Sequence, residues 1–344
     1  MSAVLRAPEP IVVRGPDADS GGTCLVYLVP GQGGDPRGAL LALYRADASA
    51  RAAIDAVLAQ IDPVGAAHGL GPVGAVLLAE DRLALPSGMA QLAGYAASVA
   101  VDRVLAAFGI RPGCVVGQSF GEIAALVCAE AFDAAEGAAA VSALTDAFRE
   151  QEGRGGMVLI RGSATDTEKL LARAGLPELV IACLDSPEET IVSGPRDAID
   201  ALLTLAESAD DGGLPPLRRL AVPYASHHPA LGEVARRFRR GLEPLPRRPL
   251  TCPVLSPVRR RAYTEADDVR EGLADCVIKP VHLIETFARL ARTHRTQDLM
   301  FVQVGVGATL CRCAEATLPG ARTVAPLADP DFHRALPRTR RPRP

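Results

Sequence analysis

The chain contains no tryptophan, and its aromatic residues make up only 4% of 344 positions. Lysine is nearly absent as well, because Lys169 and Lys279 are the only two, so almost all positive charge is arginine. The formal net charge is only −3. Proteins that bind single-stranded nucleic acid combine a basic groove with aromatic side chains on which bases stack. We therefore do not expect a nucleic-acid partner.

Long hydrophobic runs are missing too. No apolar stretch reaches the roughly 18 residues of a membrane-spanning helix, and the first 22 residues contain acids and prolines but no apolar core of a secretory signal. We expect no membrane partner and a cytoplasmic protein. Residues 1–22 are predicted to form a flexible leader, and residues 331–344, rich in proline and arginine, a disordered tail.

Spacings typical of metal sites do not occur. The eight cysteines form no CxxC pair, and no histidine stands at ligand spacing from them. Most of these cysteines lie in apolar segments, so we interpret them as small buried hydrophobic side chains. Neither a metal nor a permanently bound cofactor is expected.

The remaining composition is that of a folded globular protein, with 48% hydrophobic and 22% charged residues. Short apolar runs alternate with helical patterns, which is typical of a parallel sheet covered by helices. Strands are predicted at 24–29, 114–116, 254–256 and 301–305, and helices at 38–46, 50–61, 87–108, 230–241 and 308–317. We predict an α/β fold whose large subdomain comprises residues 23–151 and 218–330.

Residues 152–217 have a different pattern. Three short strands are interleaved with helical runs at 166–174 and 196–209. This arrangement indicates a small ferredoxin-like subdomain inserted in the larger one.

The most informative stretch is VVGQSFGE, residues 115–122. Ser119 stands between a short β-branched run and a helical pattern, with a glycine two positions away on either side. Such glycines permit the strained strand-to-helix turn that exposes a serine hydroxyl. The following helix then directs free N–H groups at the reaction centre. We predict that Ser119 is a nucleophile.

A serine hydroxyl needs a base within hydrogen-bond reach. Of the six histidines, His227 and His228 lie in a loop between a short strand and a helix. A base that meets the carboxyl edge of a parallel sheet is expected in such a loop. Two adjacent loop histidines are equally typical of an ordinary surface, so the residues alone leave both interpretations open.

Seven motifs occur in an order that resembles a known family: PGQGG, Gln91 in MAQLAG, VVGQSFGE, IVSGP, YASHHP, KPVHL and FVQVGVG. The chain is similar, over roughly residues 24 to 327, to malonyl-type acyl carrier protein transacylases and the acyltransferase domains of polyketide synthases. The resemblance implies a hydrolase-like parallel sheet core with an inserted ferredoxin-like subdomain. This agrees with the layout read from the residues.

The resemblance also implies roles. Ser119 would be the acylated nucleophile and His227 the catalytic histidine, with a backbone carbonyl at His282 orienting its imidazole. The N–H groups of Gln32 and Phe120 would form the oxyanion hole. The substrate-binding positions would be Gln91, Leu144, Tyr224 and Ser226.

The chain departs from the family pattern at three places. Gln118 stands where the family usually has histidine, and residues 303–306 read QVGV in place of an acidic residue followed by Val-Gly-Pro. Family members that take malonyl or methylmalonyl groups carry an arginine 25 positions after the serine, where this chain has Leu144. Leucine cannot form the bidentate pair with a carboxylate that arginine forms. The nearest arginine, Arg149, would lie elsewhere on a helix.

The expected function is acyl transfer in polyketide-type biosynthesis, as in the biosynthesis of antibiotics. A monocarboxylic starter, aminoacyl or peptidyl group would move from a thioester of coenzyme A or of carrier-bound phosphopantetheine, through Ser119, to an acyl carrier protein. The alternatives are a malonyl or methylmalonyl transacylase, a hydrolase that edits carrier-bound acyl groups, and an inactive module that only docks carrier proteins.

Arginines cluster in the second half of the chain. They are typical of a solvated helix face, or of a docking surface for an acidic partner. The resemblance makes an acyl carrier protein the expected partner. The candidate docking residues are Arg218, Arg219, Arg236, Arg237, Arg240, Arg259 and Arg260.

Overall fold

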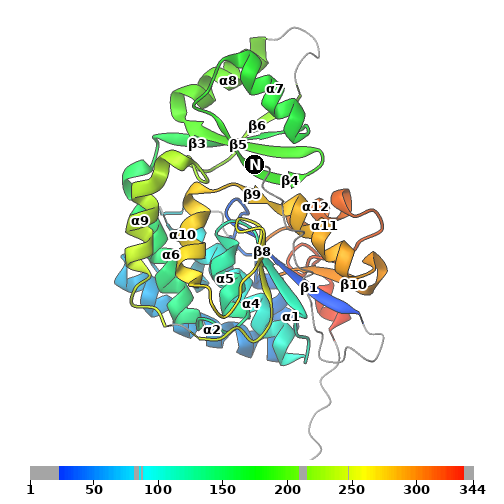
Figure 1. Cartoon of the computed structure of the whole chain (residues 1–344). Coiled ribbons are helices and arrows are strands. Elements are labelled where there is room, and N and C mark those ends of the chain that lie inside the picture. Colours follow the sequence, from blue (N-terminus) through cyan, green and yellow to red (C-terminus); the bar gives the residue numbers. More distant parts are fainter. Residues whose placement is uncertain (1–22, 81–84, 87, 209–214, 247, 337–344) are drawn as a thin grey trace, which may run out of the picture.

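The larger of two sheets has the strand order β11-β10-β1-β2-β7-β8 (Figure 1). Its parallel strands are β1 (Cys24–Val29), β2 (Cys114–Gly117), β7 (Val254–Ser256), β10 (Leu299–Gln303) and β11 (Arg322–Val324), and β8 (Arg261–Ala262) pairs antiparallel with β7. The computed structural model describes residues 23–80, 85–86, 88–208, 215–246 and 248–336. The central strands are apolar throughout because helices cover both of their faces. The predicted parallel sheet is confirmed.

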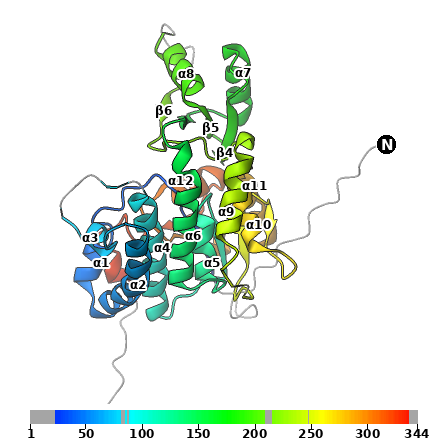
Figure 2. The same ribbon diagram turned by 90° about the vertical axis from the view of Figure 1, so that its left-hand side faces the viewer.

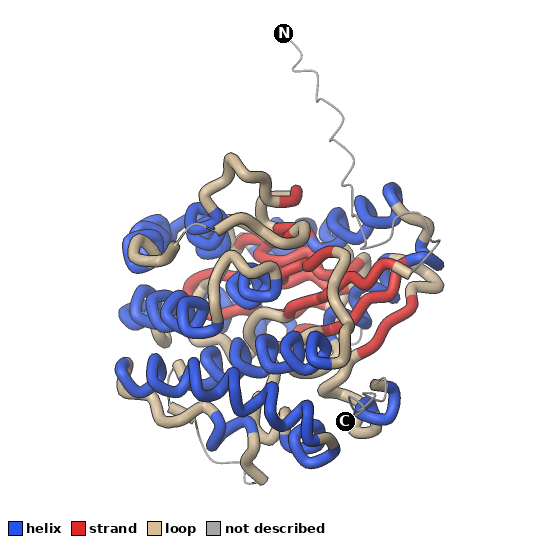
Figure 3. Tube along the Cα trace, turned by 90° about the horizontal axis from the view of Figure 1, so that it is seen from below, coloured by secondary structure: helices blue, strands red, loops and turns tan. Residues whose placement is uncertain are grey.

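Helices lie on both sides of this sheet (Figure 3). They are α1 (Leu41–Ala46), α2 (Ala48–Ala67), α3 (Gly74–Leu77), α4 (Met89–Ala107), α5 (Gly121–Cys128), α6 (Ala134–Phe148), α9 (Gly232–Gly241), α10 (Val269–Ile278), α11 (Leu283–Thr293) and α12 (Thr309–Thr317). Helix α5 packs on β1, β2 and β7, whereas α12 packs on β10 and β11. Single 3-10 turns occur at η1 (Arg149–Gln151), η2 (Pro229–Leu231), η3 (Thr296–Asp298) and η4 (Phe332–Ala335).

The N-terminus of helix α6 is well defined. This helix is relevant to the site because some of its side chains lie near Ser119. The Asp133 side chain accepts from the Glu136 N–H, and the Glu136 side chain accepts from the Asp133 N–H, both at 2.8 Å. This capping box satisfies two donors that a helix N-terminus otherwise leaves unpaired. Figure 2 shows α6, α9 and α10 below the smaller subdomain, and α9 packs against both neighbours.

The smaller subdomain follows the ferredoxin-like order of strands and helices. Its elements are β3 (Gly155–Ile160), α7 (Ala164–Ala174), β4 (Val180–Ser186), β5 (Glu189–Pro195), α8 (Arg196–Ser208) and β6 (Leu217–Arg219). The strands lie in the order β6-β3-β5-β4-β9. A separate apolar core, which includes Val158, Leu170 and Ile199, lies under its helices.

Two features of the small sheet differ from the sequence-based boundaries. Strand β6 pairs with β3 through Arg219, so the small sheet ends two residues later than the predicted 217. A fifth strand, β9 (Val281–His282), comes from the large subdomain and pairs parallel with β4. A two-residue strand has too short a pattern to be recognised in a sequence. The small sheet therefore rests on a segment of the large subdomain.

The predicted disordered tail, residues 331–344, differs in part from the structure. Residues 331–336 belong to the folded structure, where Phe332 and Leu336 are buried. Residues 337–344 of the predicted tail and the predicted leader, 1–22, lie outside the described residues. Within the described part of the chain, no helix combines the length and the apolar character needed to span a bilayer.

Candidate active site

The turn from β2 to α5 places a serine in an uncommon backbone conformation. Ser119 has a φ of 57°, in the left-handed region that non-glycine residues rarely adopt. A Cβ added at Gly117 would lie 2.5 Å from the Glu122 Cα, and one at Gly121 would overlap the Val29 carbonyl oxygen. Both glycines are therefore required for the turn. Strained positions of this kind cluster at functional sites.

His227 lies directly against this serine. The Ser119 Oγ and the His227 Nε2 are 2.6 Å apart, and the His227 Nδ1 is 2.8 Å from the Lys279 carbonyl oxygen. A carbonyl oxygen can only accept, so Nδ1 carries the ring proton. Nε2 is consequently the nitrogen that accepts a hydrogen bond from the serine hydroxyl. This arrangement can move a proton from Oγ to the imidazole.

Burial keeps that imidazole neutral. His227 is 1% exposed, and desolvation lowers its pKa to about 4, although the hydrogen bond to Lys279 acts in the opposite direction. The ring is therefore an unprotonated base from mildly acidic pH upward.

The expected role of the His282 carbonyl is wrong. The carbonyl that orients His227 belongs to Lys279, three residues earlier, whereas the His282 carbonyl accepts from the Thr286 hydroxyl at 2.9 Å. Lys279 directly follows α10, and the carbonyls at a helix C-terminus have no intrahelical partner. Pro280 has no N–H and cannot continue the helix. The end of α10 thus supplies an available acceptor.

His228 faces another part of the molecule. Its Nε2 lies 2.9 Å from the Glu178 carbonyl oxygen, and its Nδ1 accepts from the Ala230 N–H at 3.2 Å. Because an acceptor Nδ1 is unprotonated, Nε2 is the donor to Glu178. His228 therefore starts the turn that precedes α9 and is not the serine's neighbour.

We expect His227→Ala to slow acylation of Ser119 by about a hundredfold or more, the usual effect of removing a general base. His228→Ala is the matched control, since it removes the adjacent imidazole of the same loop and should change the rate little. The rate is measured as the gain of acyl mass on the intact protein. A larger loss in His228→Ala than in His227→Ala would contradict this assignment.

The predicted oxyanion-hole residues lie at two backbone segments near Ser119. Phe120 directly precedes α5, at the helix end where N–H groups lack intrahelical acceptors. Gln32 belongs to the loop after β1, and a Cβ on its neighbour Gly31 would lie 3.1 Å from the Ser119 Cβ. The loop and the turn are therefore in close contact. The roles of Phe120 and Gln32 as oxyanion donors stay predictions.

Three predicted residues meet in one hydrogen-bonded group. The Tyr224 hydroxyl donates to the Gln32 Oε1 at 2.7 Å and accepts from the Gln91 Nε2 at 3.2 Å. The Gln32 Nε2 is buried and has no hydrogen-bond partner among the described residues. A buried donor without a partner costs free energy unless a ligand or water satisfies it. This amide is thus a candidate contact for a bound group.

An aromatic cluster missed in the sequence links α6 to the site. The Phe148 ring centroid is 4.3 Å from that of Tyr224 and 5.9 Å from that of Phe120, whose ring lies 5.9 Å from His227. Leu144 is one turn before Phe148 on the same helix face and is 3% exposed. The spacing of Leu144 and Phe148 is the only signal the sequence offers.

Arg149 does not take the place of the absent arginine. Its side chain is 72% exposed and pairs with Asp146. Ser226, the remaining predicted substrate residue, is buried beside His227.

The candidate docking arginines are mostly paired within the chain. Ion pairs join Arg219 to Asp200, Arg236 and Arg240 to Glu233, Arg237 to Glu150, Arg259 to Asp267 and Arg260 to Glu285. Arg218 is exposed on β6. Exposed pairs of this kind contribute little stability, but each carboxylate offsets the positive charge next to it. The net charge of these clusters is smaller than their arginine count indicates.

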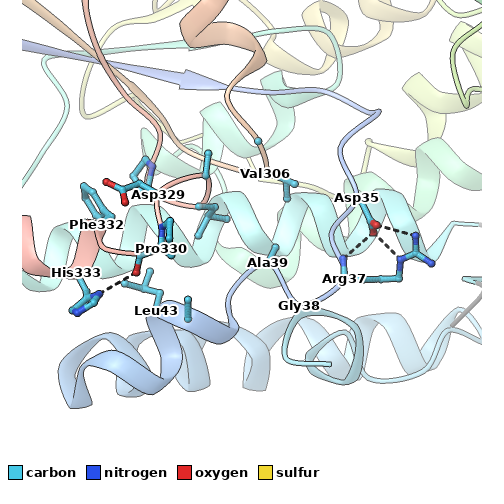
Figure 4. Close-up of a pocket in the computed structure, with 15 residues that line it drawn as sticks. Asp35, Arg37, Gly38, Ala39, Leu43, Val306, Asp329, Pro330, Phe332 and His333 are labelled. Atoms are coloured by element: carbon cyan, nitrogen blue, oxygen red, sulfur yellow. Dashed lines mark hydrogen bonds and ion pairs between the residues drawn. The ribbon is translucent and has the colours of Figure 1, made fainter. Parts of the chain in front are cut away.

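Neither Ser119 nor His227 lines either of two cavities found in the described part of the chain. One, of about 390 Å³, lies between the segment that follows β1 and the C-terminal segment, and Val306, Ala39 and Leu43 are among the residues that line it. Figure 4 shows Arg37 turned toward Asp35 at this cavity. The other, of about 660 Å³, lies between α9 and α10. Among the residues described, no cluster of three or more histidine, cysteine, aspartate or glutamate side chains is suited to hold a metal ion.

The sequence pattern of the acyl transferase domain family matches residues 26–339. The chain belongs to this family.

Curated relatives are polyketide synthase proteins. The chain is 31% identical over 246 residues to the spectinabilin polyketide synthase system protein NorA' of Streptomyces orinoci, and 32% identical over 268 residues to the polyketide synthase GfsE of Streptomyces halstedii. These alignments cover 69% and 75% of this chain but only 6% and 7% of the relatives. The chain thus spans a small fraction of the length of the curated relatives it matches.

Solved structures share the fold. The malonyl CoA-acyl carrier protein transacylase of Coxiella burnetii has a TM-score of 0.79 at 24% identity, covering 92% of this chain and 97% of that one. The acyl transferase domain of SpnD, in complex with 2-(pent-4-yn-1-yl)malonyl, has a TM-score of 0.76 at 26% identity, covering 88% and 71%. A complex described as a type II polyketide synthase acyl carrier protein with its malonyl-transacylase has a TM-score of 0.79 at 23% identity, covering 91% and 99%.

Proposed function

We propose that this chain is an acyltransferase that holds its acyl group as an ester on Ser119. The observation that carries the proposal is the contact of the Ser119 Oγ with the His227 Nε2 at 2.6 Å, with the other ring nitrogen held by the Lys279 carbonyl. Membership of the acyl transferase domain family supports it. Nucleophile, base and orienting group are all supplied by the chain itself.

In each half-reaction, one proton moves to His227 and is then returned. As the Ser119 Oγ attacks the thioester carbonyl, the His227 Nε2 takes the hydroxyl proton, and the N–H groups of Phe120 and Gln32 stabilise the negative oxygen. Collapse of this intermediate breaks the carbon–sulfur bond, and His227 returns the proton to the departing thiolate. In the second half, His227 removes the proton of the acceptor thiol, which attacks the ester. Ser119 then regains its proton.

The proposed acceptor is the phosphopantetheine thiol of an acyl carrier protein, and the donor is a thioester of coenzyme A or of a second carrier protein. One structural neighbour is described as an acyl carrier protein in complex with its malonyl-transacylase, and the curated relatives are polyketide synthase proteins. Both support a place in polyketide-type biosynthesis.

The proposed acyl group has no free carboxylate. Leu144 is buried, and the exposed Arg149 is engaged with Asp146. The unpartnered buried donor in the Tyr224 hydrogen-bonded group is the neutral amide of Gln32. A malonyl carboxylate buried against leucine would be unpaired, which costs several kcal/mol. A starter, aminoacyl or peptidyl chain avoids this cost.

A panel of acyl thioesters tests the proposal. We expect intact-mass spectrometry to show acylation by monocarboxylic thioesters within minutes and transfer to an added carrier protein. Loading by malonyl or methylmalonyl thioesters at the same rate would favour the dicarboxylic alternative. Steady thioester consumption without an acceptor would favour a hydrolase. No acylation by any thioester would favour a module that only docks carrier proteins.

Docking of an acidic carrier protein by the arginine clusters is a further part of the proposal. Arg218 is the exposed candidate without a carboxylate partner among the described residues. Attraction between exposed charges raises the encounter rate and weakens with salt. We expect physiological salt to lower turnover with a carrier-bound substrate more than with a small thioester. We also expect Arg218→Glu to raise the KM for the carrier-bound substrate and to leave the KM for the small thioester unchanged. Equal salt sensitivity of both substrates would contradict docking through these arginines.

A further inference from the structure

The side chain before the nucleophile connects two separate parts of the molecule. The Gln118 Oε1 accepts from the Gly31 N–H at 3.1 Å. The Nε2 of the same amide donates to the Asp185 Oδ1, on β4 of the small subdomain, at 3.4 Å. Gln118 thus links the loop after β1 to a strand that is distant in sequence.

The first of these contacts positions the loop. Gly31 directly precedes Gln32, whose N–H is the proposed oxyanion donor, and a Cβ on Gly31 would lie 2.8 Å from the Gln118 carbonyl oxygen. There is therefore no room for the loop to move closer to the turn. Because Gln118 also directly precedes Ser119, its amide sets the distance between the nucleophile and one oxyanion donor.

The second contact decides which way the amide points. The oxygen and nitrogen ends of a glutamine amide have nearly the same shape, so neighbouring donors and acceptors determine its orientation. An ionised carboxylate only accepts, and it therefore selects the NH₂ end. The oxygen end is then directed at Gly31. Asp185 is only 5% exposed, so it contacts Gln118 in a largely dry environment.

We propose that Asp185 is a positioning residue for acyl transfer, which in its carboxylate form orients the Gln118 amide so that Gly31 and Gln32 are held against Ser119. The inference rests on the proposed acyltransferase function. It assigns to Asp185 no contact with the substrate.

This role has a consequence for pH dependence. Burial raises the pKa of Asp185 to about 7, the hydrogen bond from Gln118 acts against this, and Glu189 raises it further. Above this pH the carboxylate accepts from Gln118. Below it, the protonated acid can donate to the Gln118 oxygen and compete with Gly31. Because the pKa of His227 is about 4, the imidazole stays neutral through this transition.

Other titratable groups lie on β4 and on the elements that pack against it. The thiols of Cys183 and Cys313 have raised pKa values because they are buried. On the helices that pack against β4, Glu285 pairs with Arg289 at 3.3 Å, and Asp166 pairs with Lys169 at 3.4 Å. His282, opposite Leu184 in β9, has a pKa lowered mainly by burial.

The test compares acylation rates from pH 5.5 to 9 in four proteins. Asp185→Asn keeps an oxygen acceptor but cannot titrate, Asp185→Leu removes the acceptor, and Glu188→Gln, exposed in the turn after β4, is the matched control. Wild type and Glu188→Gln should gain about fivefold between pH 6 and 8, because the ionised fraction rises about tenfold and the un-ionised form keeps about a tenth of the rate. Asp185→Asn should show no such rise. Asp185→Leu should be slower by about tenfold at pH 8 with KM unchanged, the effect of losing one hydrogen bond to a charged group.

Melting temperatures separate positioning from a structural effect. Because the folded state raises the pKa of Asp185, its ionisation disfavours folding as pH rises from about 4 to 7. Asp185→Asn should therefore melt higher than wild type at pH 8, and this difference should shrink as the pH falls toward 4, while the variant loses the slope of acylation rate against pH. An unchanged slope in Asp185→Asn would overturn the inference. Wild type that forms no acyl-enzyme at any pH would instead overturn the proposed function.

Discussion

Ser119→Ala is expected to lose acyl-enzyme formation by at least about a thousandfold, because it removes the hydroxyl proposed to carry the acyl ester. The fold should be retained, since the turn depends on Gly117 and Gly121 and the substitution removes one oxygen. Intact-mass spectrometry with the best acyl thioester measures the first effect, and thermal unfolding measures the second.

The matched control for this change is Ser142→Ala. Ser142 is 3% exposed on α6, and its hydroxyl has no hydrogen-bond partner among the described residues. Removing it should leave acylation unchanged, which shows that the loss in Ser119→Ala is not a general effect of replacing a buried serine. An acyl mass gained by Ser119→Ala would place the nucleophile on another residue.

The nucleophile turn is the part of the site that the sequence predicts best. A buried strand, a serine between glycines and a helix follow one another within residues 114–128, and the structure has β2, the strained Ser119 and α5 at those places. These features depend on local backbone sterics and on short-range apolar patterns, which are readable in one stretch of chain.

Contacts made by backbone atoms at the ends of helices and strands are harder to predict from the sequence. The orienting carbonyl was expected at His282 and belongs to Lys279, because its availability depends on the residue at which α10 ends. Element boundaries are the least certain part of a sequence pattern. The pairing of β9 with β4, over two residues, is likewise decided by packing between the subdomains.

Contacts between distant segments are not encoded in any local pattern. The sequence shows that Gln118 departs from the family residue, but Asp185, its partner, lies on the inserted subdomain 67 positions away. The arginine clusters present the same difficulty, because carboxylates such as Glu150, 87 positions from Arg237, offset their charge only in the folded chain. Docking by these arginines accordingly stays a proposal.

Leu144→Arg is expected to shift the acyl preference toward malonyl and methylmalonyl thioesters. Leu144 is buried one helical turn from Phe148, whose ring lies 4.3 Å from that of Tyr224. An arginine introduced there can form a bidentate pair with the free carboxylate of a dicarboxylic group. The ratio of malonyl to monocarboxylic loading should rise by about tenfold to a hundredfold. The shift should be incomplete, because the surrounding side chains are not shaped for the smaller group.

The free-energy cost of burying the new charge gives a second, independent readout, the melting temperature. Without a dicarboxylic ligand the guanidinium is buried and unpaired, so Leu144→Arg should melt below wild type, and malonyl loading should recover part of that loss because it supplies the partner. Leu144→Met, which keeps the position apolar at similar size, should retain both the wild-type preference and the melting temperature. The decisive measurement is loading of the unaltered protein: if malonyl groups acylate Ser119 as readily as the best monocarboxylic chain, the pocket recognises a carboxylate without an arginine at 144, and the substrate proposal is wrong.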